Sequence, residues 1–275
     1  YKKVKSIPAG ETPINIALSS NSKWIAISQG INGSKEGRPD AIWIMDRKKM
    51  EVEAKIDIYL TRYRERRDVF PIFSTDNKKL YTVESSTGFL NVVDTSTWKP
   101  LKKINLGAYP HNPLLSSDGK KLYVPDLYSR KVFIVDTERD QVVDSLKIDG
   151  LPSAIALNQD EKTMYVADIE NHQVIFIDIE THNVIKTVSV GTSPQNLILT
   201  DNIFLYVLNT YSNNLSIIDI RNKENIKTLD AGILPKRMAI DQTGKRLYVV
   251  SEDASIRVID LVKQEMIKAI PTDIT

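Results

Sequence analysis

Short apolar runs separated by polar turns recur along the whole chain. Residues 120–143, KKLYVPDLYSRKVFIVDTERDQVV, hold two runs rich in Val, Ile, Tyr and Phe, and a third run begins after an Asp-Thr pair. Nearly the same pattern returns at 162–185 as KTMYVADIENHQVIFIDIETHNVI. Runs of this length and composition predict β-strands, and no amphipathic helix pattern competes with them.

Three independent markers keep the same period. An Asp ends the third run of a unit, a Tyr lies in the second run, and a Pro opens four of the units. The markers are Asp94, Asp136, Asp178, Asp219 and Asp260, then Tyr81, Tyr123, Tyr165, Tyr206 and Tyr248, and finally Pro110, Pro152, Pro194 and Pro235. Successive Asp markers are 42, 42, 41 and 41 positions apart. A period of about 42 residues with four short strands per unit indicates β-propeller blades.

The four strands of one unit can be assigned from its sequence. In residues 107–148, the runs NPLLSS, KLYVPD, KVFIVD and VVDSLKI form strands A, B, C and D, and SSDGKK supplies an Asp-Gly turn between A and B. A degraded copy at 10–58 brings the number of units to six. We therefore expect an all-β protein, a β-propeller of four-stranded antiparallel blades, as a single domain over 1–275. Its repeat units lie at about 10–58, 67–106, 107–148, 149–190, 191–230 and 231–271.

The two ends of the chain leave the number of blades open. Residues 1–9 read as an extra outer strand, whereas QEMIKAI at 264–270 completes the last unit. Six blades are the favoured prediction, and seven are the alternative, in which residues 1–9 finish a further blade. In both cases the apolar residues before the repeated Asp should pack between blades: Val135, Ile177, Ile218 and Ile259.

Composition narrows the classes of function. The chain has 275 residues, a formal net charge of +2 and no Cys. The near-neutral charge argues against general nucleic-acid binding, and no apolar run approaches the ~20 residues that span a bilayer. The lack of Cys excludes disulfides, thiolate metal sites and Cys nucleophiles. The chain begins at Tyr1 rather than Met, which fits a removed leader or a trimmed piece.

Two stretches of the chain resemble a known repeat family. LYVPD…KVFIVDTERDQVVDSLKIDGLPSAIAL and MYVADIENHQVIFIDIETHNVIKTVSVGTSP are similar to the YVTN family of β-propeller repeats, over residues 70–270 and more weakly over 10–58. The resemblance implies the fold but not the activity, because the family includes enzymes, cofactor carriers and surface binding proteins. Many members are secreted, periplasmic or on the cell surface. The resemblance and the missing Met together predict an extracytoplasmic protein.

Strand alternation separates the loops into two groups. The A–B and C–D loops lie at one end of each blade, and the B–C and D–A loops lie at the other. The A–B turns are short and regular, whereas the first unit carries two insertions in the second group, QGINGSKEGRPD at 29–40 and YLTRYRERRD at 59–68. Because function concentrates in loops on a rigid scaffold, we expect the site at the B–C/D–A end. The alternative is that the two insertions are neutral changes in loops that accept extra residues.

Candidate binding residues follow from this assignment. The second insertion contains Arg62, Tyr63, Arg64, Arg66 and Arg67, and clustered Arg side chains bind carboxylate or phosphate. The alternative is a solvated basic loop that its own acidic residues partly neutralise. His111 and Arg237 lie near the start of strand A at the same end. His111 is the residue most like a ligand or general base, although His is also common at this position in the family's repeat.

No catalytic signature appears in the sequence, neither a nucleophile elbow, a zinc-protease motif nor a phosphate-binding loop. The leading hypothesis is a non-enzymatic extracytoplasmic propeller, a binding or scaffold protein that holds a partner protein or polymer on the B–C/D–A end and needs no cofactor. The alternative, implied by the resemblance, is a lactonase-like hydrolase or a haem- or metal-carrying propeller with its site at the central channel mouth. Haem would rest on His111, and a divalent cation would rest on the weak candidates Glu84, Asp126 and Asp168.

Overall fold

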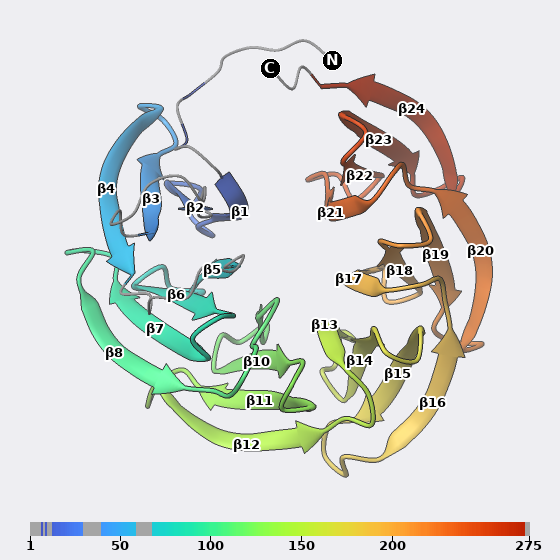
Figure 1. The fold of residues 1–275 in the computed structure, drawn as a ribbon, viewed down its shortest axis with the longest axis horizontal. Coiled ribbons are helices and arrows are strands. Elements are labelled where there is room, and N and C mark those ends of the chain that lie inside the picture. The colour runs from blue at the N-terminus through green and yellow to red at the C-terminus, as the bar shows by residue number, and fades with distance from the viewer. Residues whose placement is uncertain (1–6, 8, 10–12, 30–39, 59–67, 273–275) are drawn as a thin grey trace. The chain divides into compact units, whose positions relative to one another are not determined.

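The computed structural model describes residues 7, 9, 13–29, 40–58 and 68–272. Over these residues the chain is an all-β, six-bladed β-propeller in which every blade is a four-stranded antiparallel sheet (Figure 1). The expected fold class is confirmed, with six blades rather than seven. The extra strand expected at 1–9 lies almost entirely outside the described residues. No helix in the described ranges is long and apolar enough to span a membrane.

The contacts divide the chain into two compact units, an N-terminal unit of Lys2–Lys147 and a C-terminal unit of Ile148–Thr275. The N-terminal unit holds blades one to three: β1 (Pro13–Leu18), β2 (Trp24–Gln29), β3 (Asp40–Asp46) and β4 (Glu51–Ile58); β5 (Val69–Phe73), β6 (Lys79–Glu84), β7 (Phe89–Asp94) and β8 (Pro100–Asn105); β9 (Leu114–Leu115), β10 (Lys121–Asp126), β11 (Lys131–Asp136) and β12 (Gln141–Lys147).

The C-terminal unit holds blades four to six: β13 (Pro152–Leu157), β14 (Thr163–Asp168), β15 (Gln173–Asp178) and β16 (Val184–Ser189); β17 (Pro194–Thr200), β18 (Phe204–Asn209), β19 (Asn214–Asp219) and β20 (Glu224–Asp230); β21 (Pro235–Ile240), β22 (Arg246–Ser251), β23 (Ser255–Asp260) and β24 (Glu265–Pro271). Strands pair in chain order within every blade, so each blade is a simple meander.

Side chains from neighbouring blades form the core of each unit. In the C-terminal unit, Ile218 of blade five packs in one cluster with Tyr165 and Phe176 of blade four. The four residues expected between blades are all buried, at 2% exposure or less: Val135, Ile177, Ile218 and Ile259. Inside each unit the first strands of successive blades lie close together and the fourth strands fan apart (Figure 1). The face-to-face packing of the sheets therefore removes their apolar residues from water.

The repeated Asp shapes the turn between the third and fourth strands. Asp178 accepts hydrogen bonds from the backbone N–H groups of Thr181, at 2.8 Å, and Glu180, at 3.1 Å. The next residue, His182, has a φ of 61°. Positive φ recurs at this position of each blade in a residue other than Gly: Met50, Trp98, Asp140, His182, Lys223 and Gln264. The hydrogen bonds to the Asp side chain thus stabilise a turn with a positive-φ residue, a backbone conformation that Gly adopts elsewhere without such bonds.

These hydrogen bonds also favour the charged form of the Asp. The backbone N–H and the hydroxyl of Thr181 hold the pKa of Asp178 below its usual range. The pKa is lowered in the same turn of the other five blades, at Asp46, Asp94, Asp136, Asp219 and Asp260. Because the folded-state pKa is lower than the unfolded value, each carboxylate stabilises the fold above the unfolded pKa and loses this effect as pH falls through the folded pKa.

We expect Asp178→Asn to destabilise the protein at neutral pH and to have a much smaller effect in acid. The wild-type carboxylate of the folded protein takes up a proton only as pH falls through its lowered pKa, so the advantage of the charged side chain disappears below that pH. Urea denaturation of the two proteins between neutral pH and about pH 2 measures the difference in the free energy of unfolding. A difference that stays constant over this range would contradict the assigned role of the charge.

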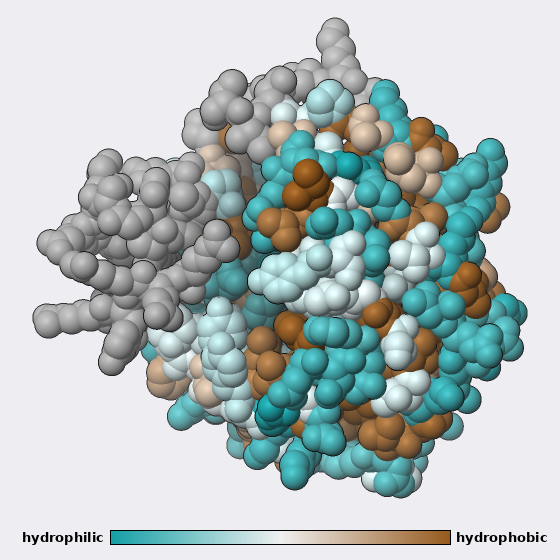
Figure 2. Space-filling view, turned by 45° about the vertical axis from the view of Figure 1, so that its right-hand side comes forward, coloured by the Kyte–Doolittle hydropathy of each residue, from teal (hydrophilic) through white to brown (hydrophobic). Residues whose placement is uncertain are grey.

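The fourth strands carry a β-bulge next to this turn. One extra residue interrupts the register between the third and fourth strands, for example Val143 between the pairs Ile134–Asp144 and Val135–Val142. In five blades this residue is apolar and 45–56% exposed: Leu101, Val143, Ile185, Ile226 and Ile267. In Figure 2 the hydrophobic residues, in brown, are interspersed with hydrophilic ones on the face shown. The hydrophobic residues on this face are therefore spread among polar ones rather than gathered in one patch.

Candidate functional site

The arginine-rich insertion lies outside the described residues, and so do its candidate binding residues Arg62, Tyr63, Arg64, Arg66 and Arg67. Nearly all of the other insertion, at 29–40, also lies outside them. The role of the arginine-rich insertion as a binding site for carboxylate or phosphate stays a prediction. The described loops at the B–C/D–A end belong to blades two to six.

Blade three departs from the repeat at this end. Its first strand, β9, has only two residues, and the segment before it keeps one isolated bridge between Pro110 and Asp126. Pro113 has no N–H to donate to a ladder, and the preceding Asn112 has a φ of 23°. The irregular backbone of residues 109–113 carries the His111 ring beside blade two.

The His111 ring belongs to a row of aromatic side chains within the N-terminal unit. Its centroid lies 4.4 Å from that of Phe70 at the start of β5 and 6.1 Å from that of Tyr109. The Tyr109 ring in turn lies 5.2 Å from the ring of Tyr128, in the turn between β10 and β11. We call these four residues the aromatic row. The His111 Nε2 atom also lies 3.9 Å from a carboxylate oxygen of Asp68.

The aromatic row leads from the core to the surface. Phe70 is buried, the His111 side chain is 12% exposed and Tyr128 is 67% exposed. Rigid aromatic rings with polar tips lose little entropy on binding and are common at the centres of interfaces. His111 itself packs against rings and faces Asp68, so the arrangement resembles a packed contact surface more than a general base with a substrate.

Arg237, the remaining binding candidate, lies on β21 in the C-terminal unit. Its Nη1 atom donates to the backbone carbonyl of Lys236 at 3.0 Å. The Lys236 ammonium forms an ion pair with Glu252 at 2.9 Å, with both side chains partly exposed. This part of blade six is therefore a mixed-charge surface.

The proposed metal ligands are occupied by contacts within their own blades. The buried Asp168 carboxylate accepts hydrogen bonds from the backbone N–H groups of Leu151, at 3.0 Å, and Glu170, at 3.1 Å, and from the Gln173 amide at 3.0 Å. Asp126 accepts from the backbone N–H groups of Tyr109, at 3.0 Å, and Ser129, at 2.8 Å.

Glu84 has the same position in blade two and accepts from the Thr87 hydroxyl at 2.7 Å and from the Asn91 amide. No group of three His, Asp or Glu side chains among the described residues could hold a metal ion. The equivalent position in blade six is occupied by Ser251, which pairs with Pro235, and Glu252 follows it. Asp126 and Asp168 thus connect the B–C and D–A loops of their blades, whereas Glu84 accepts from residues of the hairpin between β6 and β7.

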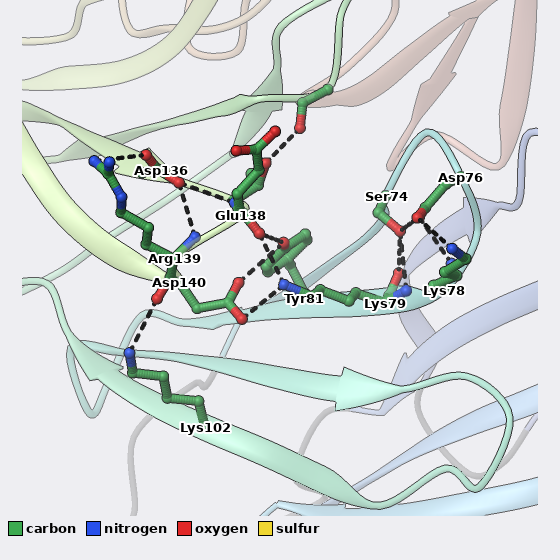
Figure 3. A network of polar contacts seen from close by, with 12 residues as sticks. Ser74, Asp76, Lys78, Lys79, Tyr81, Lys102, Asp136, Glu138, Arg139 and Asp140 are labelled. Carbon is green, nitrogen blue, oxygen red and sulfur yellow. Dashed lines mark hydrogen bonds and ion pairs between the residues drawn. The ribbon is translucent and has the colours of Figure 1, made fainter.

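The opposite end of blades two and three is joined by a polar network (Figure 3). The Lys79 ammonium donates to the Asp140 carboxylate at 2.7 Å and to the carbonyl of Thr137 at 2.8 Å. The hydroxyl of the repeated Tyr81 lies 3.2 Å from Asp140 and 3.3 Å from the same carbonyl. Burial, and then the nearby Asp140 charge, raise the pKa of Tyr81. Tyr81 therefore ties the second strand of blade two to the turn between the third and fourth strands of blade three.

Blade five shows the same Tyr without this hydrogen bond. Burial raises the pKa of Tyr206 to about 12, and its hydroxyl is buried without a hydrogen-bond partner in the described structure. The Gln264 amide offsets part of the rise in pKa, but its geometry toward the hydroxyl is not that of a hydrogen bond.

We expect Tyr81→Phe to lower the free energy of unfolding by about 1–2 kcal/mol, because it removes a hydrogen bond to a charged group and leaves Asp140 with one donor fewer. Tyr206→Phe is the matched control and should not lower it, because it removes a buried hydroxyl that makes no hydrogen bond in the described structure. Thermal and urea denaturation of both variants measure the difference. Equal losses at the two positions would show that the network does not act as described.

Sequence reasoning missed Asp68, Tyr109 and Tyr128 as candidate site residues. A signal was present, because Pro110 and Pro113 bracket His111 in blade three, whereas blades four to six have one Pro at the start of the first strand. An extra Pro marks a segment that cannot join a regular ladder.

Comparisons with known proteins bear on the fold. The family model described as YNCE-like beta-propeller matches residues 73–203, slightly less than half of the chain. The structure of hydrazine synthase from Kuenenia stuttgartiensis is similar, with a TM-score of 0.77 and 20% sequence identity over 98% of this chain and 89% of that chain. No curated protein matches the sequence. The chain is thus a β-propeller repeat protein similar to the YNCE-like propellers, and the finer resemblance to the YVTN repeat stays a prediction.

Proposed function

We propose that this chain is a non-enzymatic binding or scaffold propeller that works outside the cytoplasm. It holds a partner protein or polymer through the loops of the B–C/D–A end. The aromatic row of blades two and three is the observation that supports this proposal most strongly. The buried carboxylates near it serve the loops of their own blades, which favours binding over catalysis.

The aromatic row has the features of an interface anchor. Tyr128 presents a large exposed ring, and its neighbour Tyr109 is fixed by the hydrogen bond from its backbone N–H to Asp126. The rings of Phe70 and His111, at the buried end of the row, are in contact with each other. A preorganised aromatic surface of this kind costs little conformational entropy when a partner covers it. The insertion at 59–68 directly precedes β5, so its arginines come a few residues before Phe70 in the chain.

We expect Tyr128→Ala to weaken partner binding at least about tenfold, the loss of about 1.4 kcal/mol or more that defines an important interface residue. The melting temperature should remain nearly unchanged because the ring is exposed. The partner is first isolated with the immobilised wild-type protein from extracytoplasmic material of the native source. Its affinity for each purified variant is then measured by biolayer interferometry.

Tyr211→Ala is the matched control for this experiment. Tyr211 occupies the equivalent turn in blade five and is 68% exposed, against 67% for Tyr128. The control variant should bind like the wild type, and equal binding by both variants would refute a role for the aromatic row. Changing Arg64, Arg66 and Arg67 together to Ala tests the insertion, and it should weaken binding and its salt dependence. Cell fractionation of the tagged gene product tests the location.

A further inference from the structure

A groove of about 300 Å³ opens between blades one and two of the N-terminal unit. One wall comes from the fourth strand of blade one, β4, through Ile56 and Asp57. The other comes from the third and fourth strands of blade two, β7 and β8, and includes Val93 and Leu101. The volume suits a small molecule rather than a helix or an extended chain.

Polar residues of blade two line the groove at positions where blades three and four carry apolar ones. Thr82 on β6 occupies the position of Val124 and Val166, as the registers of β6, β10 and β14 with their third strands show. Asn91 on β7 occupies the position of Phe133 in blade three. A short amide in place of a phenyl ring leaves the space between the blades unfilled.

The floor of the groove is polar but its hydrogen bonds are largely internal. The Asn91 amide nitrogen donates to the Thr82 hydroxyl at 3.3 Å and to the buried Glu84 carboxylate. Thr82 and Glu84 are both 1% exposed. The negative charge behind the floor disfavours an anionic group at this depth, since like charges repel strongly where water is excluded.

The rim of the groove offers a fixed positive charge. The Lys103 ammonium lies 4.1 Å from the centroid of the Phe89 ring, which holds it by a cation–π contact. Lys102 is adjacent, and its ammonium reaches toward blade three, where it donates to the carbonyl of Arg139 at 3.2 Å. Asp57 stands on the opposite wall. Positive charge therefore predominates on the β8 side of the entrance.

We propose that this groove binds a small aliphatic carboxylate. Its hydrocarbon chain lies against Ile56, Val93 and Leu101, and its carboxylate pairs with Lys103 at the rim. The aliphatic walls supply the affinity, and the charge pattern, positive at the rim and negative behind the floor, fixes the orientation. This site is independent of the partner-binding surface proposed for the aromatic row.

Octanoate is the test ligand, and methyl NMR of the intact chain is the measurement. Octanoate should shift the methyl resonances of Ile56 and Val93 in a saturable way at millimolar or lower concentration. Octylammonium, which has the same chain with the opposite charge, should bind at least about tenfold more weakly. No saturable shift at these methyl groups, or equal affinity for the two probes, would overturn the proposal.

Two variants locate the ligand within the groove. Lys103→Met keeps most of the side-chain stem but removes the charge, and it should weaken octanoate about tenfold. Asn91→Phe installs the residue of blade three and should abolish the shift of Ile56 and Val93 by filling the groove. If Asn91→Phe does not fold, Lys103→Met and the comparison of the two probes decide the question.

Lys55→Met is the matched control for the charge. Lys55 lies on β4 with its ammonium 3.9 Å from the centroid of the Trp43 ring, so it makes the same kind of contact in blade one. It should change octanoate affinity less than about twofold. An equal loss in Lys55→Met and Lys103→Met would mean that general surface charge, not the groove, attracts the probe, and the proposal would fail.

Discussion

Truncation of Ile218 to Ala should lower the free energy of unfolding by about 2–5 kcal/mol. The side chain is fully buried and packs against Tyr165 and Phe176 of the preceding blade. Alanine would leave a cavity in a sheet-to-sheet interface that two rigid blades cannot close, so the loss includes both transfer and cavity energy. Urea denaturation followed by circular dichroism measures it.

Ile226→Ala is the control for this prediction. Ile226 is the bulge residue of β20 in the same blade and is 46% exposed, so its truncation should cost less than about 1 kcal/mol. The comparison separates burial between blades from hydrophobic character in general. Similar losses for the two variants would mean that the interface between blades four and five is not the core that the packing indicates.

The second large effect is expected at Asp168, where Ala should cost about 3–4 kcal/mol. The carboxylate is fully buried and accepts from three backbone N–H groups, of Leu151, Glu170 and Asn171, and from the side-chain amides of Asn171 and Gln173. Removing it leaves donors in the D–A loop and the B–C loop without their acceptor, and each buried unsatisfied donor is costly.

Asp149→Ala tests whether any acidic residue of this region has the same effect. Asp149 is exposed and lies in the same loop as Leu151, so its truncation should change the free energy of unfolding by less than about 0.5 kcal/mol. The loss in Asp168→Ala should also appear as faster amide hydrogen exchange at Leu151 and Glu170. Unchanged exchange at both amides would contradict the role of Asp168 as the link between the two loops.

The fold could be predicted from the sequence because one pattern is repeated six times. The period of Asp178 and its equivalents locates a turn whose chemistry is local, since the carboxylate bonds to residues two and three positions later. The residues before that Asp are buried for a different reason: alternation along a strand fixes which face of the sheet their side chains share. Local hydrogen bonding and strand alternation are the two physical links that a single sequence carries most reliably.

The candidate site could be predicted only in part. Strand alternation placed His111 at the correct end of blade three, but it gave no information on which rings it meets, because those contacts come from another blade. The polar pair of Thr82 and Asn91 was also visible in the aligned repeats, yet its meaning depends on which sheet faces it. Contacts between blades decide both cases.

The bulges of the fourth strands affect how molecules meet in concentrated solution. A β-strand of a second molecule can extend a blade only by pairing with a continuous row of N–H and C=O groups along the blade's edge strand. One extra residue in that edge strand interrupts the row. In β16 the bulge residue Ile185 is followed directly by Lys186, and β20 and β24 repeat this order. A charged residue beside an apolar one discourages edge-to-edge stacking. The bulge therefore protects the outer edge of each blade against edge-to-edge pairing and fibre growth. A propeller with more blades does not gain more edge strands that can pair with another molecule.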